Sequence, residues 1–404
     1  MRAGCRGAAA LPGHRHCAAR VRAKAVIADD SAAGGLADVL PSALAVLGVP
    51  DSPDALGLRE RLDGVRRIVV LLVDGLGYHL LPLAAPTAPT LAEVLAGRLG
   101  TLTELAAPFP STTPVSLATL CTGVPSGAHG ILGFTVNVPG TRRVLSHVTW
   151  SGDPDPGRWQ PVPTQFARAA RAGVPACVVA RPEFAGSGLS EAVYRGARYL
   201  GAPDESLADR ILDALAEHRL VYGYYPQLDT TAHVSGIASE EWAAAASDVD
   251  RLLARLVGGL PADAALLVSA DHGMLDVPAD HRFDLADDAR LREGVAVMAG
   301  EPRVRYLHTA PGAVPDVLAA WRDALGPAAR VYSREEAVAA GYFGPVPEEH
   351  LARIGDVVVI CQDRYVVLDS RRERNTVCRL VAYHGSDSDV ERGVPLVVYS
   401  GQSA

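Results

Sequence analysis

The chain has 404 residues, of which 49% are hydrophobic and 21% are charged, the balance of an ordinary globular protein. Its formal net charge of −8 argues against a basic surface that binds polyanions, so we expect no nucleic acid polymer as partner. Apolar runs are too short to span a bilayer, and we expect no membrane partner. The length is enough for one large domain and a smaller one.

Residues 1–28 carry Arg and Lys side chains but no acidic ones, and their apolar runs are too short for the core of a signal peptide. We therefore expect residues 1–34 to be disordered or a misassigned start, with the ordered fold beginning near Gly35. The six cysteines form no CxxC pair, so they do not indicate a disulfide framework. This use of cysteine favours a reducing compartment, and we expect a cytoplasmic protein of undetermined oligomeric state.

The rest of the chain alternates between strand-like and helix-like segments, which predicts an α/β fold with a mostly parallel sheet sandwiched by helices. Residues 67–73 form a nearly continuous apolar run, as in a strand buried on both faces. Further strands are expected at 100–105, 175–180, 220–225, 264–269 and 394–399. Helices are expected at 36–47, 89–96, 163–171, 204–218 and 239–257, and an irregular excursion at 134–162.

One polar turn, Pro-Ser-Thr-Thr-Pro at 110–114, leads directly into an apolar helix that begins near Val115. Thr113 precedes Pro114, a residue suited to the first helical position, so its hydroxyl lies at the positive end of the helix. Free backbone N–H groups and that dipole suit an attacking alkoxide and the anion that it attacks. The alternative is that these hydroxyls only cap the helix.

Acidic and histidine side chains follow several of the predicted strands. They are Asp74, Asp229 with His233, Asp271 with His272, and His384 near the final strand. Ligand groups gather at the carboxyl ends of parallel strands, so we expect these residues to converge on the edge where Thr113 lies. Each alone is compatible with a cap or turn role. Together they indicate divalent metal ions, and mixed carboxylate and imidazole ligands favour zinc, with manganese or iron next.

With these residues in place, the chain resembles the nucleotide pyrophosphatase/phosphodiesterase branch of the alkaline phosphatase superfamily. The resemblance rests on VDGLG at 73–77, PSTTP at 110–114, TGxPxxxHGI at 122–131, DxxxHxxG at 229–236, SADHGM at 269–274 and HG at 384–385. It implies an alkaline-phosphatase-like fold with two metal ions, most commonly Zn²⁺. By position, one ion would be held by Asp74, Asp271 and His272 with Thr113 as nucleophile, and the other by Asp229, His233 and His384.

The resemblance implies hydrolysis of phosphodiester or pyrophosphate bonds in small nucleotide-type substrates, through a phospho-threonine intermediate. Phosphomonoesterase, phosphonate hydrolase and phosphomutase activities on the same core stay open, as does a metal-stabilised binding protein without turnover. The segments around the ligands contain no lysine or arginine, which favours a singly charged diester over a doubly charged monoester. Cations could reach the site only from Arg282, from a cap subdomain expected at residues 285–374, or from residues 371–379.

Two departures from the family bear on the substrate. Gly133 and Phe134 stand where the diesterases usually carry an Asn that bonds a phosphoryl oxygen, and the nearest Asn is Asn137. Two residues separate Pro226 from Asp229 where the family often has Pro-Asp. Phe134, Tyr224 and Tyr225 are candidate walls for an apolar ester group, although packing in the core is an equal alternative.

Residues 285–374 lack the metal motifs and predict a small inserted α+β cap subdomain within a core of residues 35–284 and 375–404. Strands are expected at 303–308 and 330–332, and helices at 314–325 and 333–340. We expect residues 356–361 and 365–368 to form a hairpin around Gln362-Asp-Arg364.

Overall fold

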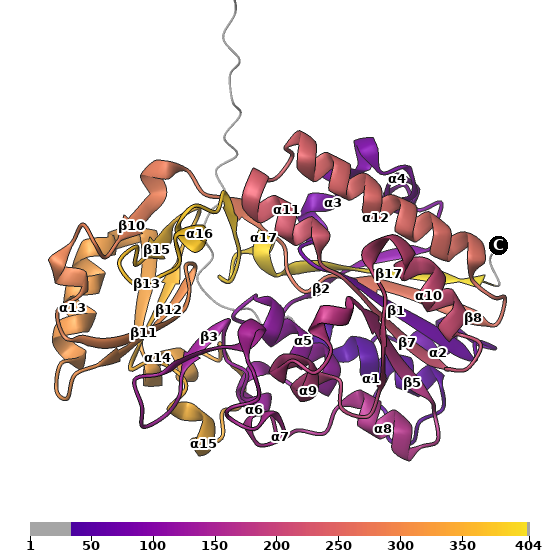
Figure 1. The fold of residues 1–404 in the computed structure, drawn as a ribbon, viewed down its shortest axis with the longest axis horizontal. Helices are drawn as coiled ribbons and strands as arrows, with labels where there is room; N and C mark the ends of the chain where they lie inside the picture. Colours follow the sequence, from indigo (N-terminus) through magenta and orange to yellow (C-terminus); the bar gives the residue numbers. More distant parts are fainter. Residues whose placement is uncertain (1–33, 402–404) are drawn as a thin grey trace, which may run out of the picture.

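The structure is a computed structural model in which residues 34–401 are described, so residues 1–33, including nearly all of the expected disordered or misassigned start, lie outside the described residues. A seven-stranded sheet forms the larger half of the molecule (Figure 1). Its order is β2 (Thr101–Ala106), β17 (Gly393–Ser400), β8 (Ala264–Ser269), β1 (Arg67–Val73), β7 (Leu220–Tyr225), β5 (Ala176–Ala180) and β6 (Arg198–Gly201). The five strands from β8 to β6 are parallel, and β17 runs antiparallel to both of its neighbours. The expected mostly parallel α/β fold is confirmed.

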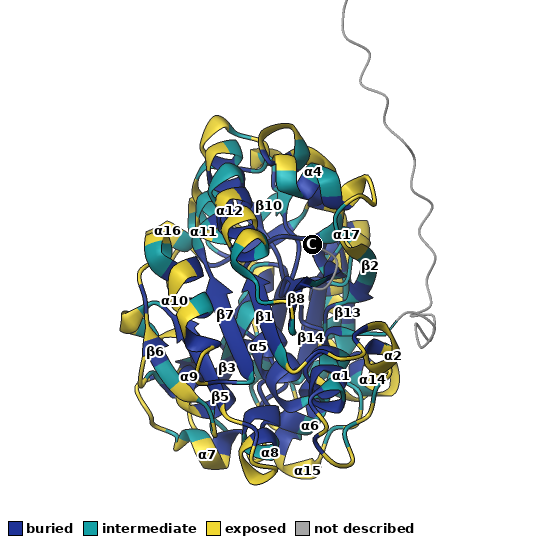
Figure 2. Ribbon diagram, turned by 90° about the vertical axis from the view of Figure 1, so that its right-hand side faces the viewer, coloured by how far each residue is buried: buried dark blue, intermediate teal, exposed yellow. Residues whose placement is uncertain are grey.

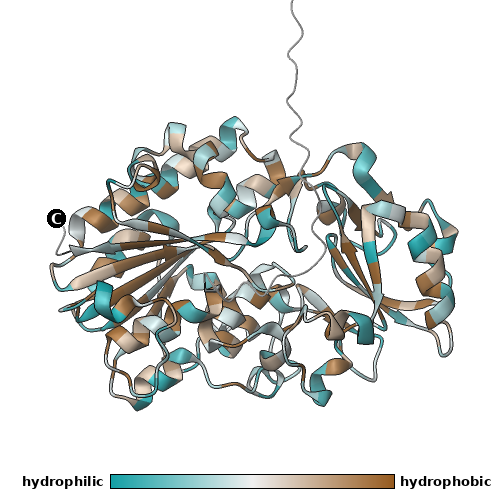
Figure 3. Cartoon of the chain, turned by 180° about the vertical axis from the view of Figure 1, so that it is seen from behind, coloured by the Kyte–Doolittle hydropathy of each residue, from teal (hydrophilic) through white to brown (hydrophobic). Residues whose placement is uncertain are grey.

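Helices cover both faces of this sheet, which explains why its central strands are apolar along their whole length. In Figure 1, α10 (Leu207–Ala214), α11 (Gln227–Ser235) and α12 (Glu240–Gly259) lie above the sheet. Below it lie α1 (Val39–Val46), α5 (Thr113–Thr122), α8 (Gln165–Arg171) and α9 (Gly188–Val193). Every residue of β1 after Arg67 is buried, and Figures 2 and 3 show the sheet as buried and hydrophobic between more polar helices.

Shorter elements complete this half of the molecule. They are α2 (Leu58–Arg61), α3 (Leu81–Ala84), α4 (Pro89–Leu95), α6 (Ser126–His129), α7 (Pro156–Trp159), α16 (Asn375–Cys378), α17 (Asp389–Arg392), and the two-residue strands β9 (Leu275–Asp276) and β16 (Ala382–Tyr383). The expected irregular excursion contains a short hairpin, β3 (Thr135–Asn137) with β4 (Val144–Ser146). No helix among residues 34–401 is long and apolar enough to cross a membrane.

A second, antiparallel sheet lies beside the core in the order β11 (Val295–Glu301), β12 (Val304–Thr309), β14 (Val357–Cys361) and β13 (Ala329–Ser333). The helices α13 (Val314–Leu325), α14 (Arg334–Ala339) and α15 (Glu348–Leu351) belong to the same segment. We call residues 285–374 the cap; its exact boundaries stay a prediction. Strand β11 was not anticipated from the sequence.

The expected hairpin of residues 356–361 and 365–368 is wrong. Strand β14 pairs with β12 on one edge and with β13 on the other, so neither edge is left for the segment that comes after it. That segment, β15 (Val366–Leu368), instead runs parallel to β10 (Arg282–Asp284). Local turn chemistry could not reveal this, because the competing partners come from distant parts of the chain.

Candidate active site

The helix α5 begins at Thr113, one residue earlier than Pro114, so Thr113 is its first residue and Thr112 precedes it. The Thr112 side chain makes no capping hydrogen bond. The Ser111 hydroxyl donates instead to the backbone oxygen of Ser386, and Thr113 Oγ1 lies 3.3 Å from His272 Nε2. These contacts disfavour the interpretation that the hydroxyls only cap a helix, since none of the three does so.

The carboxylates come from the ends of three adjacent parallel strands. Asp74 directly follows β1, Asp229 lies in the first turn of α11 after β7, and Asp271 follows β8. Glycines allow these strand ends to approach closely: a Cβ built at Gly77 would lie 2.5 Å from the Gly273 Cα. The predicted convergence is therefore seen in the structure, with all three side chains at one edge of the sheet.

Each of the three histidines is oriented by a hydrogen bond from Nδ1 to a backbone carbonyl oxygen. The partners are Gly273 for His272 at 3.1 Å, Ala382 for His233 at 2.8 Å, and Ser111 for His384 at 2.9 Å. A carbonyl can only accept, so the proton is on Nδ1 and the lone pair on Nε2. This arrangement, in which an outer group fixes ring and tautomer, is typical of metal-binding histidines.

The free Nε2 atoms face carboxylate oxygens, and that of His272 also faces the Thr113 hydroxyl. His272 Nε2 lies 3.3 Å from Asp74 Oδ1 and 3.3 Å from Asp271 Oδ2. His233 Nε2 lies 3.4 Å, and His384 Nε2 3.8 Å, from Asp229 Oδ1. These carboxylate oxygens are buried and accept no hydrogen bond from the described residues. Acceptors that face one another in a buried site are stabilised by a cation between them, so the donor set fits bound metal.

The electrostatics of this ligand cluster point the same way. Burial raises the pKa of Asp74 well above its usual range, and the nearby Asp271 and Asp229 raise it further. Burial also raises the pKa of Asp229 to about 6. It lowers the pKa of His272 to about 3, and it lowers that of His384 well below its usual range. Without a cation, the cluster disfavours charge of either sign.

Two sets of three ligands have their donor atoms mutually within 4.8 Å. The first is Asp74, Asp271 and His272, as the resemblance implied. The second is Asp229, His272 and His384, so His272 appears in both sets, whereas the expected ligand His233 appears in neither. His233 Nε2 still lies 3.4 Å from Asp229 Oδ1. The ring centroids of His233 and His384 are 5.1 Å apart, which keeps both imidazoles beside Asp229. The roles of the individual ligands stay predictions.

Two cavities flank the ligand cluster, and Phe134 lines both of them. The aromatic cavity, of about 230 Å³, contains Asp74, Thr113 and Asp229. Its walls are mostly apolar, and they include Phe134, Val148, Phe184, Leu189, Tyr194, Tyr199 and Tyr224. No Arg or Lys of the described residues lines it.

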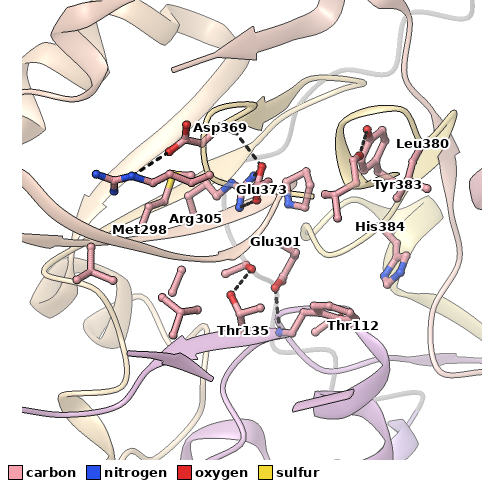
Figure 4. Close-up of a pocket in the computed structure, with 18 of the residues that line it drawn as sticks. Thr112, Thr135, Met298, Glu301, Arg305, Asp369, Glu373, Leu380, Tyr383 and His384 are labelled. Carbon is pink, nitrogen blue, oxygen red and sulfur yellow. Dashed lines mark hydrogen bonds and ion pairs between the residues drawn. The ribbon is translucent and has the colours of Figure 1, made fainter. Parts of the chain in front are cut away.

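The cap–core cavity, of about 550 Å³, lies on the side of His233 and His384 (Figure 4). Core residues such as Thr112 and Thr135 form one wall, and the cap supplies Met298, Glu301 and Arg305. Figure 4 shows Glu301 between these core threonines and the cap strand, with His384 further along the same cavity.

The predicted walls divide into two groups. Phe134 lines both cavities, and Tyr224 lines the aromatic cavity while its hydroxyl donates to Asp74 Oδ2. Tyr225 lines neither cavity; its backbone oxygen accepts from the Asp74 N–H, and its side chain is buried, as the core-packing alternative expected. Asn137 is buried in β3 and also lines neither cavity.

Sequence reasoning missed several lining residues. Phe184, Tyr194 and Tyr199 come from the segment around α9 and β6, where no motif marks them. Glu301 and Thr112 line the cap–core cavity, and Glu301 ends the strand that was not anticipated. The acidic Glu301 next to Pro302 was a possible sequence signal for a lining residue. The sequence did not show, however, that β11 lies against the core.

Solved structures share this fold at low sequence identity. Mouse ectonucleotide pyrophosphatase/phosphodiesterase 5 superposes with a TM-score of 0.68 at 20% identity, covering 83% of this chain and 88% of its own. An inactive variant of that protein in complex with AMP gives 0.67 at 20% identity, covering 83% and 88%. Phosphonoacetate hydrolase from Sinorhizobium meliloti 1021 in complex with phosphonoformate gives 0.64 at 20% identity, covering 83% and 90%. No curated protein sequence matches the chain.

The fold and the family match together define a phosphoric ester hydrolase of the alkaline phosphatase superfamily. The family model for type I phosphodiesterase / nucleotide pyrophosphatase matches residues 68–387. The chain therefore belongs to the type I phosphodiesterase / nucleotide pyrophosphatase family, as the sequence motifs predicted.

Proposed function

We propose that this protein hydrolyses phosphodiesters of small molecules, nucleotide esters among them, with Thr113 as the nucleophile and two divalent metal ions, most favourably Zn²⁺, in the ligand cluster. The observation that carries the proposal is the pair of cavities that meet at this cluster. A diester has two organic groups on one phosphorus, and two cavities that share Phe134 in their walls can accommodate one each. A monoester would fill only one of them.

Metal ions held by Asp74, Asp271 and His272, and by Asp229, His233 and His384, would neutralise phosphoryl charge and acidify bound hydroxyl groups. The chain itself supplies the geometry. Thr113 Oγ1 lies 3.3 Å from His272 Nε2 at the start of a ten-residue helix, where the dipole favours an alkoxide. The Thr113 oxygen attacks phosphorus to form a phospho-threonine, which water then hydrolyses.

The charge around Thr113 supports a diester. A monoester carries a second negative charge, which a fixed arginine usually neutralises. The aromatic cavity offers no such cation among the described residues. Arg282, a candidate from the sequence, donates to the backbone oxygens of Val277, Cys378 and Leu380 and lines neither cavity. Arg142, Arg305 and Arg372 line the cap–core cavity instead.

The experiment compares kcat/KM for bis-p-nitrophenyl phosphate, the p-nitrophenyl ester of a nucleotide, and p-nitrophenyl phosphate at one pH, with metal content measured on the same sample. We expect both diesters to exceed the monoester, with activity lost on chelation and restored by Zn²⁺. A clear preference for the monoester, or full activity in chelated protein, would contradict the proposal. Cleavage of phosphonoacetate at a higher kcat/KM than the diesters would instead support a phosphonate hydrolase, the activity named for one structural neighbour.

A further inference from the structure

Glu301 is an acidic side chain of the cap that lies against the core. It ends β11, and its Oε2 accepts a hydrogen bond of 3.0 Å from the Phe134 N–H. The adjacent Gly300 oxygen accepts one of 2.7 Å from the Thr135 hydroxyl. Two neighbouring hydrogen bonds therefore fix this end of the cap strand to the start of β3, and they place the Glu301 carboxyl in the wall of the cap–core cavity.

Gly385 makes room for this carboxyl. A Cβ built at Gly385 would lie 2.8 Å from Glu301 Cγ and 3.1 Å from Oε1. Gly385 follows His384, so the side chain is inserted beside the backbone that carries a predicted metal ligand. A side chain at residue 385 would displace it.

The second oxygen of Glu301 is unused. Oε1 is buried and has no hydrogen-bond partner among the described residues, and the same is true of Thr112 Oγ1 in the same cavity. The residue itself is 6% exposed. Leaving such a group without a partner costs free energy, so unused groups in a cavity wall call for a ligand or a solvent partner.

The other charged groups of this cavity are paired or lie toward solvent. Arg305 pairs with Glu373 at 2.7 Å and also donates to the Val367 oxygen. Arg372 has a side chain that is 68% exposed and lies 3.9 Å from Asp369, and Arg142 is exposed. Among the charged residues described in this wall, Glu301 is therefore the buried one with an oxygen left available, beside the unpartnered hydroxyl of Thr112.

The position of the cavity relative to Thr113 gives it a role in the reaction. Displacement at phosphorus is in line, so the leaving oxygen departs on the side opposite the attacking one. Thr113 lines the aromatic cavity and not the cap–core cavity, whereas His233 and His384 line the cap–core cavity. The leaving group therefore departs toward the cap.

We propose that the cap–core cavity binds the leaving alcohol of the phosphodiester, and that Glu301 selects an uncharged alcohol bearing a second hydroxyl group, such as glycerol, by hydrogen bonding to that hydroxyl. This rests on the diesterase activity proposed above. A hydroxyl group can donate to a carboxylate or accept from a carboxylic acid, so it suits either state of the side chain. Burial raises the pKa of Glu301 to about 8, with Glu391 adding to the rise and the Phe134 N–H and Arg305 opposing it. A simple alkyl alcohol of the same length would leave the Glu301 oxygen without a partner.

In the proposed reaction, each bond that breaks at phosphorus is matched by one that forms. The bond from Thr113 Oγ1 to phosphorus forms while the bond from phosphorus to the alcohol oxygen breaks. The proton lost by Thr113 is matched by the proton, exchanged through solvent, that the alcohol oxygen gains as it leaves. Water then attacks the phospho-threonine, which restores the Thr113 hydroxyl and releases the phosphomonoester. Glu301 touches only the distal hydroxyl of the alcohol and takes no part in either proton transfer.

The test compares two AMP diesters that differ only in the leaving alcohol, the glyceryl and the n-propyl ester, by following AMP release. We expect the wild-type protein to favour the glyceryl ester by about tenfold in kcat/KM. Glu301→Leu removes the carboxyl, and Glu301→Asp withdraws it by one methylene. Both variants should bring the ratio of the two kcat/KM values close to that of the uncatalysed reaction. Glu293→Gln, an exposed cap position, is the control and should keep the wild-type ratio.

The ratio is informative because a general loss of structure lowers both rates together. If Glu301→Leu fails to fold, Glu301→Asp with a near-wild-type melting temperature decides the question. An unchanged ratio in a folded Glu301 variant would overturn the assignment of the cavity. If the wild-type protein does not hydrolyse bis-p-nitrophenyl phosphate, the diesterase proposal itself fails; if it does and the ratio does not respond to Glu301, only this inference fails.

Discussion

The imidazole rings of His272 and His384 are stacked, with centroids 3.5 Å apart and planes inclined by 10°. One ring follows a central parallel strand and the other comes from the C-terminal segment, so the contact joins residues 112 positions apart. Because both rings are held through Nδ1, their free Nε2 atoms are presented to the carboxylates of the same cluster. This contact is where the two predicted metal positions meet.

Replacing His384 should therefore open one metal position and spare the other. We expect His384→Ala to retain about one metal ion per chain, as measured by elemental analysis, and to lose at least about 100-fold in kcat/KM. The melting temperature should change little in chelated protein, where the metal contribution to stability is absent from both proteins. His79→Asn changes an exposed histidine paired with Glu104 and should leave metal content unchanged. Wild-type activity in His384→Ala would contradict the assignment.

The nucleophile can be identified among three neighbouring hydroxyl groups. Thr113→Ala should abolish turnover while keeping metal content and melting temperature near wild type, because only the attacking oxygen is lost. Thr113→Ser should keep part of the rate, since that oxygen survives. Thr112→Ala keeps the attacking oxygen and should retain turnover, although its side chain lines the cap–core cavity. A dead Thr112→Ala together with an active Thr113→Ala would show that the register is wrong.

Replacing Asp229 should change stability with a sign that depends on bound metal and a size that depends on pH. Burial raises its pKa from 3.8 to about 6, so in chelated protein its contribution favours the fold below pH 3.8 and is lost as pH rises through 6. Asp229→Asn removes that cost, and it should raise the melting temperature of chelated protein by a few degrees at pH 8 and by less at pH 5.

With Zn²⁺ present the sign should reverse, because the Asn variant loses a ligand and the stabilisation that binding provides. Comparing the variant with wild type at each pH cancels the opposing titration of His272 and His384. Asp213→Asn, at an exposed position of α10, is the control. A destabilised Asp229→Asn in chelated protein at pH 8 would argue against a raised pKa.

Tyr224 should tune the first metal position without holding the metal. Its hydroxyl donates to Asp74 Oδ2, which orients the other oxygen of that carboxylate toward His272. Tyr224→Phe should lower zinc affinity by about 10- to 100-fold, as measured with a competing chelator, while the fold is retained. Tyr222→Phe removes a hydroxyl two residues away on the same strand that makes no hydrogen bond to the described residues of the cluster, and should have no such effect. Equal zinc affinity in both variants would contradict this role.

Much of the fold and of the ligand set could be read from the sequence. The strands at 67–73, 220–225 and 264–269 were predicted with the bounds that the structure shows, because a strand buried on both faces needs an unbroken apolar run. Asp74 and Asp271 come just after such strands, and residues at the carboxyl ends of parallel strands lie at one edge of the sheet. Residue type and position relative to a strand were therefore enough to predict their convergence.

Other features depended on which segments meet in space. The pairing of β15 with β10 instead of β14 was decided by strands that already occupied both edges of β14. Likewise, the sequence leaves Tyr224 and Tyr225 equivalent, whereas alternation along β7 brings only Tyr224 to the aromatic cavity.

Glu301 shows the same limit most clearly. As a sequence position it is one acid among many, and no motif surrounds it. The tertiary structure buries it against Phe134 and Gly385, residues that are far away in the chain, and thereby leaves one of its oxygens without a partner among the described residues. The sequence alone determined the buried strands, through their apolar pattern, and the ligand residues, through their type and their place after a strand. The walls of the cavities were decided only by tertiary structure, because burial and hydrogen bonding there depend on contacts between the cap and the core.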